Sequence, residues 1–321
     1  METGLISEDQ RAIMVPDEAL IEDWLRWCKD AEDASEATLT AYRKSLRVFR
    51  NWLVHIGPGL VMPETVIAFK AHLQERYKPQ TINLRLSAVR SFYRWMVITG
   101  KLRVSPASEV KGAKRPNSKR HKRDALSNGE VLAVLETCDD GPIGIRDRAI
   151  LVLMAYCALR TIEVHRANIG NLKTGNDRLI LEVQGKGRRE ADEVAVIPRS
   201  QEPAIRAWVA LRMVFPRHSE GDPLFVSMSN RNAGGRLSTR AIRWIVKERY
   251  RRAGVAGKRK TSHSLRHSAI TNAIRHGAQP LQVKALARHG SFDTSLIYFH
   301  EEARTANPAE DLITYEGGRK E

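Results

Sequence analysis

The sequence predicts a mainly α fold with a small β-sheet, divided into two domains. Helical amphipathic patterns fill most of the first hundred residues and most of the chain after residue 126. Two segments with strand-like alternation, 178–184 and 192–198, flank a Gly-Lys-Gly-Arg-Arg turn and predict a β-hairpin. We therefore expect an N-terminal tail (1–15), a helical domain (16–106), a basic linker (107–125), a second domain (126–305) and a C-terminal helix or tail (306–321).

Four helices are expected in the first domain. The second begins at the cap candidate Ser35 and carries an apolar stripe along one face. Pro63 suits the first position of the third helix, and Gly100 suits the end of the fourth. The expected ranges are 18–31, 35–53, 63–77 and 82–100.

The second domain is expected to begin with a helix capped by Ser127. The longest apolar run of the chain, 149–159, is about half the roughly 20 residues that a membrane-spanning helix needs, so it predicts a buried core helix. Arg160 follows at its exit, with a short helical turn through Glu163. After the hairpin, further helices are expected at 201–214, 238–253, 265–276, 280–288 and 308–315.

The chain carries a large excess of positive charge. Lys and Arg total 53 against 37 for Asp and Glu, and the formal net charge of the 321 residues is +16. Such an excess favours nucleic acid as a partner, because each neutralised phosphate releases condensed counterions. The alternative is a merely basic, solvated surface.

Nothing in the sequence predicts export or a membrane. The first ten residues contain acids and no apolar stretch behind a basic start, so no secretory signal is expected. The three cysteines are widely spaced and form no CxxC pair, which fits a reducing cytoplasm and argues against structural zinc. A cytoplasmic, nucleoid-associated protein is expected.

Basic residues gather on two helices of the first domain and in the linker. A charged helix face is often only solvated, but here arginine and lysine occur with hardly any acid between them, which favours phosphate contact. The linker segment 111–123 contains no acid; a nuclear-localisation signal is the competing interpretation. The candidate DNA-binding residues are Arg43, Lys44, Arg47, Arg85, Arg90, Lys114, Arg115, Lys119, Arg120, Arg240 and Arg243.

A second set of residues offers what phosphodiester chemistry without a metal requires. Guanidiniums can hold non-bridging oxygens, a lysine or histidine can move protons, and a phenol can attack phosphorus. Taken singly each residue has an ordinary alternative, such as a surface ion pair for Arg160, so the prediction depends on the whole set. The candidate catalytic residues are Arg160, Lys186, His263, Arg266, His289 and Tyr298.

No metal or other cofactor is expected at this set. His263 and His267 stand four residues apart, as the two histidines of a metal site do on a helix. The glutamate of an HExxH motif is missing and no third ligand is evident, so we reject zinc.

The chain resembles the tyrosine recombinase (phage integrase) family, and most closely its simple Xer-like members. The resemblance lies in these residues, in their order, and in the nine-residue step from His289 to Tyr298. The resemblance covers nearly the whole sequence. It implies a helical SAM-like core-binding domain and a tyrosine recombinase catalytic domain, without an arm-binding domain.

The resemblance also implies a role for each candidate. Arg160 and Arg266 would clamp the scissile phosphate, and Lys186 would protonate the departing 5′ oxygen. His263 and His289 would bind the phosphate and assist proton transfer, while Tyr298 would form a 3′-phosphotyrosine link. Glu163 would orient the arginine or pack the short helix.

The expected activity is site-specific DNA recombination through a Holliday junction, independent of metal and ATP. The resemblance implies double-stranded DNA as substrate and a homo-tetramer on DNA formed from free monomers, and it is compatible with a partner recombinase or accessory protein. Two other functions stay open: a type IB topoisomerase-like nicking and closing enzyme, and a catalytically inactive DNA-binding regulator.

The chain departs from the family pattern at three positions. Ala158 stands where glycine is usual, Ser262 where proline is common, and Ala287-Arg288-His289 replaces Leu-Gly-His. Each change touches packing or a backbone turn rather than the chemistry. Arg288 could in addition contact a phosphate.

Overall fold

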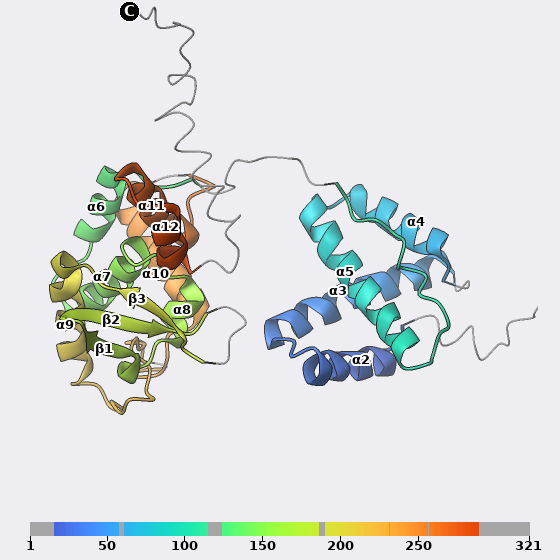
Figure 1. Ribbon diagram of the computed structural model, residues 1–321, viewed down its shortest axis with the longest axis horizontal. Coiled ribbons are helices and arrows are strands. Elements are labelled where there is room, and N and C mark those ends of the chain that lie inside the picture. Colours follow the sequence, from blue (N-terminus) through green and yellow to red (C-terminus); the bar gives the residue numbers. More distant parts are fainter. Residues whose placement is uncertain are drawn as a thin grey trace, which may run out of the picture. The chain divides into compact units, whose positions relative to one another are not determined.

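The chain forms two units, Met1–Asn117 and Ser118–Glu321 (Figure 1). The computed structural model describes residues 16–57, 61–114, 124–185, 190–230, 232–255 and 257–288. Each unit has its own buried hydrophobic core. The expected helix at 308–315 lies outside the described residues.

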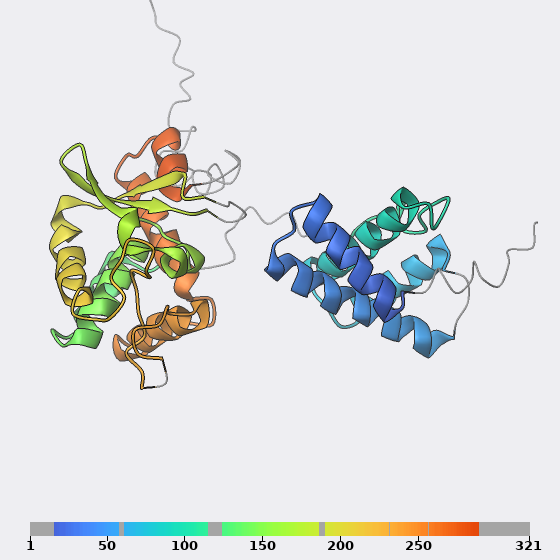
Figure 2. The ribbon, with the colours of Figure 1, turned by 90° about the horizontal axis from the view of Figure 1, so that it is seen from below.

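The first unit is a bundle of helices around an aromatic core (Figures 1 and 2). The side chains of Asp17 and Ser35 cap the first two helices. Trp24, Phe49 and Phe92 are fully buried, and the Trp24 and Phe92 rings meet edge to face. The helices are α2 (Glu18–Ala31), α3 (Glu36–Ile56), α4 (Pro63–Gln74) and α5 (Pro79–Ile98).

The four expected helices of this unit are confirmed, with shifted bounds, and the clearest shift is at the end of α4. This helix stops at Gln74 rather than at residue 77, because the Arg76 and Tyr77 N–H groups both donate to the Leu73 carbonyl and close a turn. The next helix then starts at Pro79, three residues earlier than its apolar stripe indicated.

The first part of the expected linker packs onto the first unit. Ala107, Val110 and Ala113 are buried in its core. The Asn83 side chain on α5 accepts a hydrogen bond from the Ala113 N–H (2.7 Å) and donates one to the Ala113 carbonyl (3.0 Å). A Cβ at Gly112 would lie 2.6 Å from the Asn83 Oδ1 atom, so a larger residue there would displace the Asn83 amide. The packed region therefore continues beyond residue 106, to Ala113.

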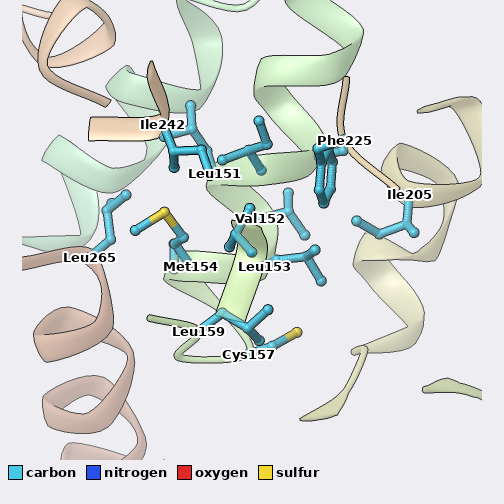
Figure 3. Close-up of a cluster of buried hydrophobic side chains, with 14 of the residues drawn as sticks. Leu151, Val152, Leu153, Met154, Cys157, Leu159, Ile205, Phe225, Ile242 and Leu265 are labelled. Atoms are coloured by element: carbon cyan, nitrogen blue, oxygen red, sulfur yellow. The ribbon is translucent and has the colours of Figure 1, made fainter. Parts of the chain in front are cut away.

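The second unit is built around one buried helix, α7, which packs against α9 and α11 (Figure 3). Its residues Leu151, Val152 and Leu153 are buried on all sides. Within its described residues, the helices are α6 (Asn128–Glu136), α7 (Pro142–Ala155), α8 (Thr161–Arg166), α9 (Glu202–Arg212), α10 (Thr239–Arg252), α11 (Ser262–Arg275) and α12 (Pro280–Ala287), with short 3-10 turns η1 (Ile169–Asn171) and η2 (Arg199–Gln201).

The buried helix ends earlier than its apolar run predicts. It stops at Ala155, and Ala158 then takes a left-handed conformation with φ of 52°. The Leu159 N–H donates to the Leu153 carbonyl and closes the turn. Cys157, Ala158 and Leu159 stay buried but are no longer helical, which turns the chain toward Arg160.

A three-stranded antiparallel sheet completes the second unit, in the order β1 (Leu172–Gly175), β2 (Arg178–Val183) and β3 (Glu193–Val196). The pairing of Ile180 with Val196 confirms the expected hairpin. The sequence did not predict the four-residue strand β1, which pairs Leu172 with Leu181. Among the described residues, no helix is long and apolar enough to cross a membrane.

Candidate active site

The structure describes three of the six candidate catalytic residues. Arg160 is at the start of α8, and His263 and Arg266 are in the first half of α11. Lys186, His289 and Tyr298 lie outside the described residues.

Arg160 is held at the start of α8 by Glu163. Its backbone N–H donates to Glu163 Oε2 (2.8 Å), and its Nη1 donates to Glu163 Oε1 (2.5 Å). The glutamate is thus both a helix cap and a partner for the guanidinium. The Glu163 side chain is fully buried, whereas that of Arg160 is 22% exposed. The buried Glu163 therefore holds Arg160 in place, while part of the Arg160 side chain remains accessible to a ligand from solvent.

Arg266 meets Arg160 at a shared carbonyl group. Its guanidinium is buried, with Nη1 donating to the Ala158 carbonyl (2.5 Å) and Nη2 donating to the Ala287 carbonyl. Arg160 Nη2 approaches the same Ala287 oxygen (3.5 Å) and donates to the Arg288 carbonyl (3.2 Å). The structure thus brings together the two arginines that the sequence places more than a hundred positions apart.

A third guanidinium, that of Arg288, joins this group. Its Nη2 donates to Glu163 Oε2 (3.1 Å) and to the Ala158 carbonyl (3.0 Å). Its side chain is only 3% exposed, and its guanidinium donates to acceptors within the protein. A phosphate contact by Arg288 stays a prediction, because Arg266 is buried to a similar degree. We call Arg160, Arg266, Arg288 and Glu163 the arginine cluster.

Glu163 is ionised within the arginine cluster. Burial alone would raise its pKa, but the charge of Arg288, the Arg160 N–H and the charges of Arg160 and Arg266 outweigh burial and hold the pKa below its usual range. The expectation that Glu163 orients the arginine agrees with its direct contact with Arg160. A buried carboxylate in this position keeps the positive charges together.

His263 lies on the exposed first turn of α11, three residues before the buried Arg266. The cap residue Thr261 begins this turn and accepts a hydrogen bond from the His263 N–H (3.3 Å). His267, one turn further along, is buried, with its Nδ1 3.5 Å from Thr271 Oγ1. The two histidines thus have different surroundings, one at the surface and one in the interior.

Two departures from the family pattern fall at left-handed backbone positions. Ala158 has φ of 52° and Arg288 has φ of 48°, a region that favours glycine. Sequence reasoning placed glycine at both positions in relatives but missed that the Arg288 side chain would bond to the turn around Ala158. The signal in the sequence was Arg288 itself, a long polar residue at a turn position where relatives carry glycine.

The candidate DNA-binding arginines of α3 have acidic neighbours from another helix. Arg43 donates to both carboxylate oxygens of Glu22 (2.8 and 2.7 Å). Arg47 pairs with Glu18, which also contacts Arg50 (3.2 Å). The face that the sequence of α3 alone presents as purely basic therefore carries mixed charges, because α2 supplies carboxylates.

The remaining DNA-binding candidates differ in their contacts within the protein and in their exposure to solvent. Arg90 donates to the Val110 carbonyl (Nε, 3.1 Å) and so helps to hold the packed linker segment. The Arg85 guanidinium lies 3.8 Å from the centre of the Tyr77 ring. The exposed candidates are Lys44, Lys114, Arg240 and Arg243. Arg115, Lys119 and Arg120 lie outside the described residues.

The second unit thus holds a buried carboxylate that gathers guanidiniums, one of them partly exposed to solvent, which is an arrangement suited to binding a phosphate. Residues 124–304 match the phage integrase family, and residues 21–100 match the phage integrase N-terminal SAM-like domain. The chain belongs to the phage integrase family. Its activity is that of a tyrosine-type site-specific recombinase, and the predicted succession of a SAM-like and a catalytic domain is confirmed.

Curated relatives align along most of this chain. Tyrosine recombinase XerC of Yersinia pestis is 30% identical over 293 residues, which cover 87% of this chain and 89% of the relative. Tyrosine recombinase XerD of Lacticaseibacillus casei is 28% identical over 285 residues, which cover 88% of this chain and 93% of the relative.

Solved structures share the fold. The XerH site-specific recombinase bound to the palindromic difH substrate superimposes with a TM-score of 0.72 at 16% identity, over 99% of this chain and 92% of that one. The lambda integrase tetramer bound to a Holliday junction gives a TM-score of 0.65 at 13% identity, over 91% of this chain and 80% of that one.

Proposed function

We propose that this recombinase breaks and rejoins DNA strands through a covalent 3′-phosphotyrosine link made by Tyr298. The observation that carries the proposal is the meeting of Arg160 and Arg266 at the Ala287 carbonyl, beside a buried carboxylate. Two guanidiniums so placed can neutralise the two non-bridging oxygens of one phosphodiester.

The remaining candidates complete a balanced reaction. The Tyr298 hydroxyl oxygen attacks phosphorus, its proton passes to a neighbouring histidine, and the bond from phosphorus to the 5′ oxygen breaks. Lys186 donates a proton to the departing 5′ oxygen. His263 and His289 hydrogen-bond the phosphate and take part in the proton transfers. Since a 5′ hydroxyl from another strand reverses these steps, the scheme needs neither metal nor ATP.

Strand exchange needs two duplexes and more than one subunit. The lambda integrase structure shows a tetramer on a Holliday junction, and we propose that this chain assembles in the same way as a homo-tetramer on double-stranded DNA. The net charge of +16 supports binding to that polyanion. We further propose that it acts in the cytoplasm, on nucleoid DNA.

A trapping experiment tests the proposed chemistry. The binding site is first mapped by footprinting, and a duplex carrying that site is then nicked beside the cleavage position so that the released fragment diffuses away. The wild-type protein should give a covalent adduct that resists detergent, and Tyr298→Phe should give none. Tyr156→Phe, which alters another tyrosine of the same unit, is the matched control and should still form adduct.

Two outcomes would overturn parts of the proposal. Adduct formed by Tyr298→Phe would show that another residue is the nucleophile. Relaxation of a supercoiled plasmid that lacks the mapped site, at the rate seen with the site present, would favour the topoisomerase-like activity over recombination.

A further inference from the structure

Arg288 occupies an unusual place for an arginine. It is the left-handed residue that ends α12, with φ of 48° and ψ of 53°, and its side chain is buried. Left-handed backbone is costly for a side chain of this size, and burying a guanidinium costs more still unless it is well paired. Both costs point to contacts that hold the residue there.

Those contacts join Arg288 to both phosphate-binding arginines. Arg288 and Arg160 share the Glu163 carboxylate, one on each oxygen. Arg288 and Arg266 share the Ala158 carbonyl. Arg160 and Arg266 share the Ala287 carbonyl, next to Arg288 itself. Each pair of arginines in the arginine cluster is thus linked through one common acceptor.

Arg288 also changes the charge balance of the arginine cluster. With it, three guanidiniums surround one carboxylate and a net charge of two positive units remains. Without it, Glu163 would bond to Arg160 and be influenced by Arg266 only through charge, and half of that net charge would be lost. The nearby Cys157 thiol does not alter the balance, because burial raises its pKa to about 12 and keeps it neutral.

We propose that Arg288 is a positioning residue for cleavage, which acts by neutralising Glu163 so that the Arg160 guanidinium stays available to the scissile phosphate. This role rests on the proposed function of the site. In this role Arg288 acts through Glu163, because its guanidinium donates to Glu163 and to the carbonyls of Cys157 and Ala158.

The test compares a charged and an uncharged scissile group. Full-length wild type, Arg288→Gln and Arg288→Lys are assayed for single-turnover adduct formation on the nicked duplex, with either a normal phosphate or a methylphosphonate at the cleavage position. Glutamine removes the charge and keeps a polar stem, whereas lysine keeps the charge without the planar fork. Arg249→Gln, which breaks another buried arginine–carboxylate pair of the same unit, is the matched control.

On the normal phosphate, Arg288→Gln should lower the cleavage rate about 10- to 100-fold, since transition-state charge is less well neutralised. On the methylphosphonate its rate should stay within about threefold of wild type, because no phosphate charge remains to be neutralised. Arg288→Lys should recover much of the loss. The control should show the same small change on both substrates.

The outcomes distinguish failure of the role given to Arg288 from failure of the proposed function. Equal losses on both substrates, or no loss on either, would show that Arg288 does not act through charge at the phosphate and would overturn its role. A selective loss in Arg249→Gln as well would overturn it too, because the effect would then be general to the unit. If wild type gives no adduct at all, the proposed function fails, and the role given to Arg288 fails with it.

Discussion

Among the described residues of the second unit, two buried groups of arginines surround a carboxylate, and they are built differently. Around Asp147, Arg146 donates to Oδ1 through Nε and Nη2 (3.0 and 2.7 Å), and Arg249 donates to Oδ2 in the same manner (3.0 and 2.7 Å). The exposed fractions of these three side chains are all 8% or less. We call them the Asp147 cluster.

In the arginine cluster, each guanidinium donates fewer hydrogen bonds to the carboxylate than in the Asp147 cluster. Each of Arg160 and Arg288 reaches Glu163 through a single terminal nitrogen of its guanidinium, and the Arg160 side chain remains 22% exposed. The Asp147 cluster is closed on itself, which suits a structural role. In the arginine cluster, some guanidinium N–H groups do not contact the carboxylate, and the Arg160 side chain is partly exposed, which suits binding of a phosphate. The contrast predicts that the way a carboxylate divides its oxygens among arginines distinguishes a structural cluster from a functional one.

The largest expected effect concerns stability at the Asp147 cluster. Asp147→Asn leaves two buried guanidiniums without a counterion, so it should lower the free energy of unfolding by about 3–5 kcal/mol, or the Tm of the second unit by roughly 10 °C. Scanning calorimetry measures this shift. Glu182→Gln, which removes the exposed pair with Lys173, is the control and should change the Tm little. A Tm of Asp147→Asn equal to that of wild type would remove the structural half of the comparison.

The next effect is on chemistry at the arginine cluster. Arg160→Gln removes a guanidinium from the open side, so cleavage of the nicked duplex should fall about 10²- to 10³-fold, with a Tm near that of wild type. Arg206→Gln, at an exposed arginine on α9, serves as the matched control and should cleave normally. A large drop in Tm for Arg160→Gln would mean that this arginine, like Arg249, is chiefly structural.

A smaller effect, with a distinct pH dependence, is expected for Glu163→Gln. Because folding lowers the pKa of Glu163, the ionised carboxylate stabilises the folded state above its unfolded-state pKa, and this stabilisation is lost as the pH falls toward the lowered folded value. Wild type should therefore exceed Glu163→Gln in unfolding free energy by about 2–3 kcal/mol at neutral pH, and the difference should shrink below the usual carboxyl range. Urea titrations at several pH values measure it. A difference that grows on acidification would reverse the inferred sign.

The smallest effect is expected at the exposed pairs of the first unit. Glu18→Gln should leave thermal stability unchanged, because the pairs of Glu18 with Arg47 and Arg50 are largely solvated. It should increase affinity for duplex DNA a few-fold, by about one additional phosphate contact in the salt dependence, if these arginines face DNA. Asp23→Asn, which removes the exposed partner of Arg26 on the same helix, is the control. Unchanged affinity would remove Arg47 from the set of DNA-binding residues.

Local signals in the sequence predicted most of the fold. Ser35 and Ser127 are helix caps that lie next to clear apolar stripes, and the helices begin where these residues indicate. The end of α7 was not predictable, since Ala158 is a good helix former and only the turned backbone excludes it from the helix. The strand β1 is four residues long, too short to carry a recognisable alternation.

For the candidate site, order along the chain predicted which arginines come together, whereas the arrangement that depends on packing was not predicted. Arg160 and Arg266 were expected to act as a pair, and they share the Ala287 carbonyl. The inward direction of Arg288 depends on the burial of Glu163, which a local pattern does not reveal. The acids that reach the arginines of α3 come from α2, which lies about a helix length away in sequence. Contacts between secondary-structure elements were thus the part that the sequence did not predict.

The hydrogen bond between the Arg288 side chain and the Ala158 carbonyl ties together the two turns that lack glycine. For protein engineering, positions 158 and 288 therefore form one exchangeable module rather than two independent sites. Installing the glycine common in relatives at position 288 alone would free the backbone and delete a cross-link at the same time. Chimaeras with other recombinases should carry both residues from the same parent.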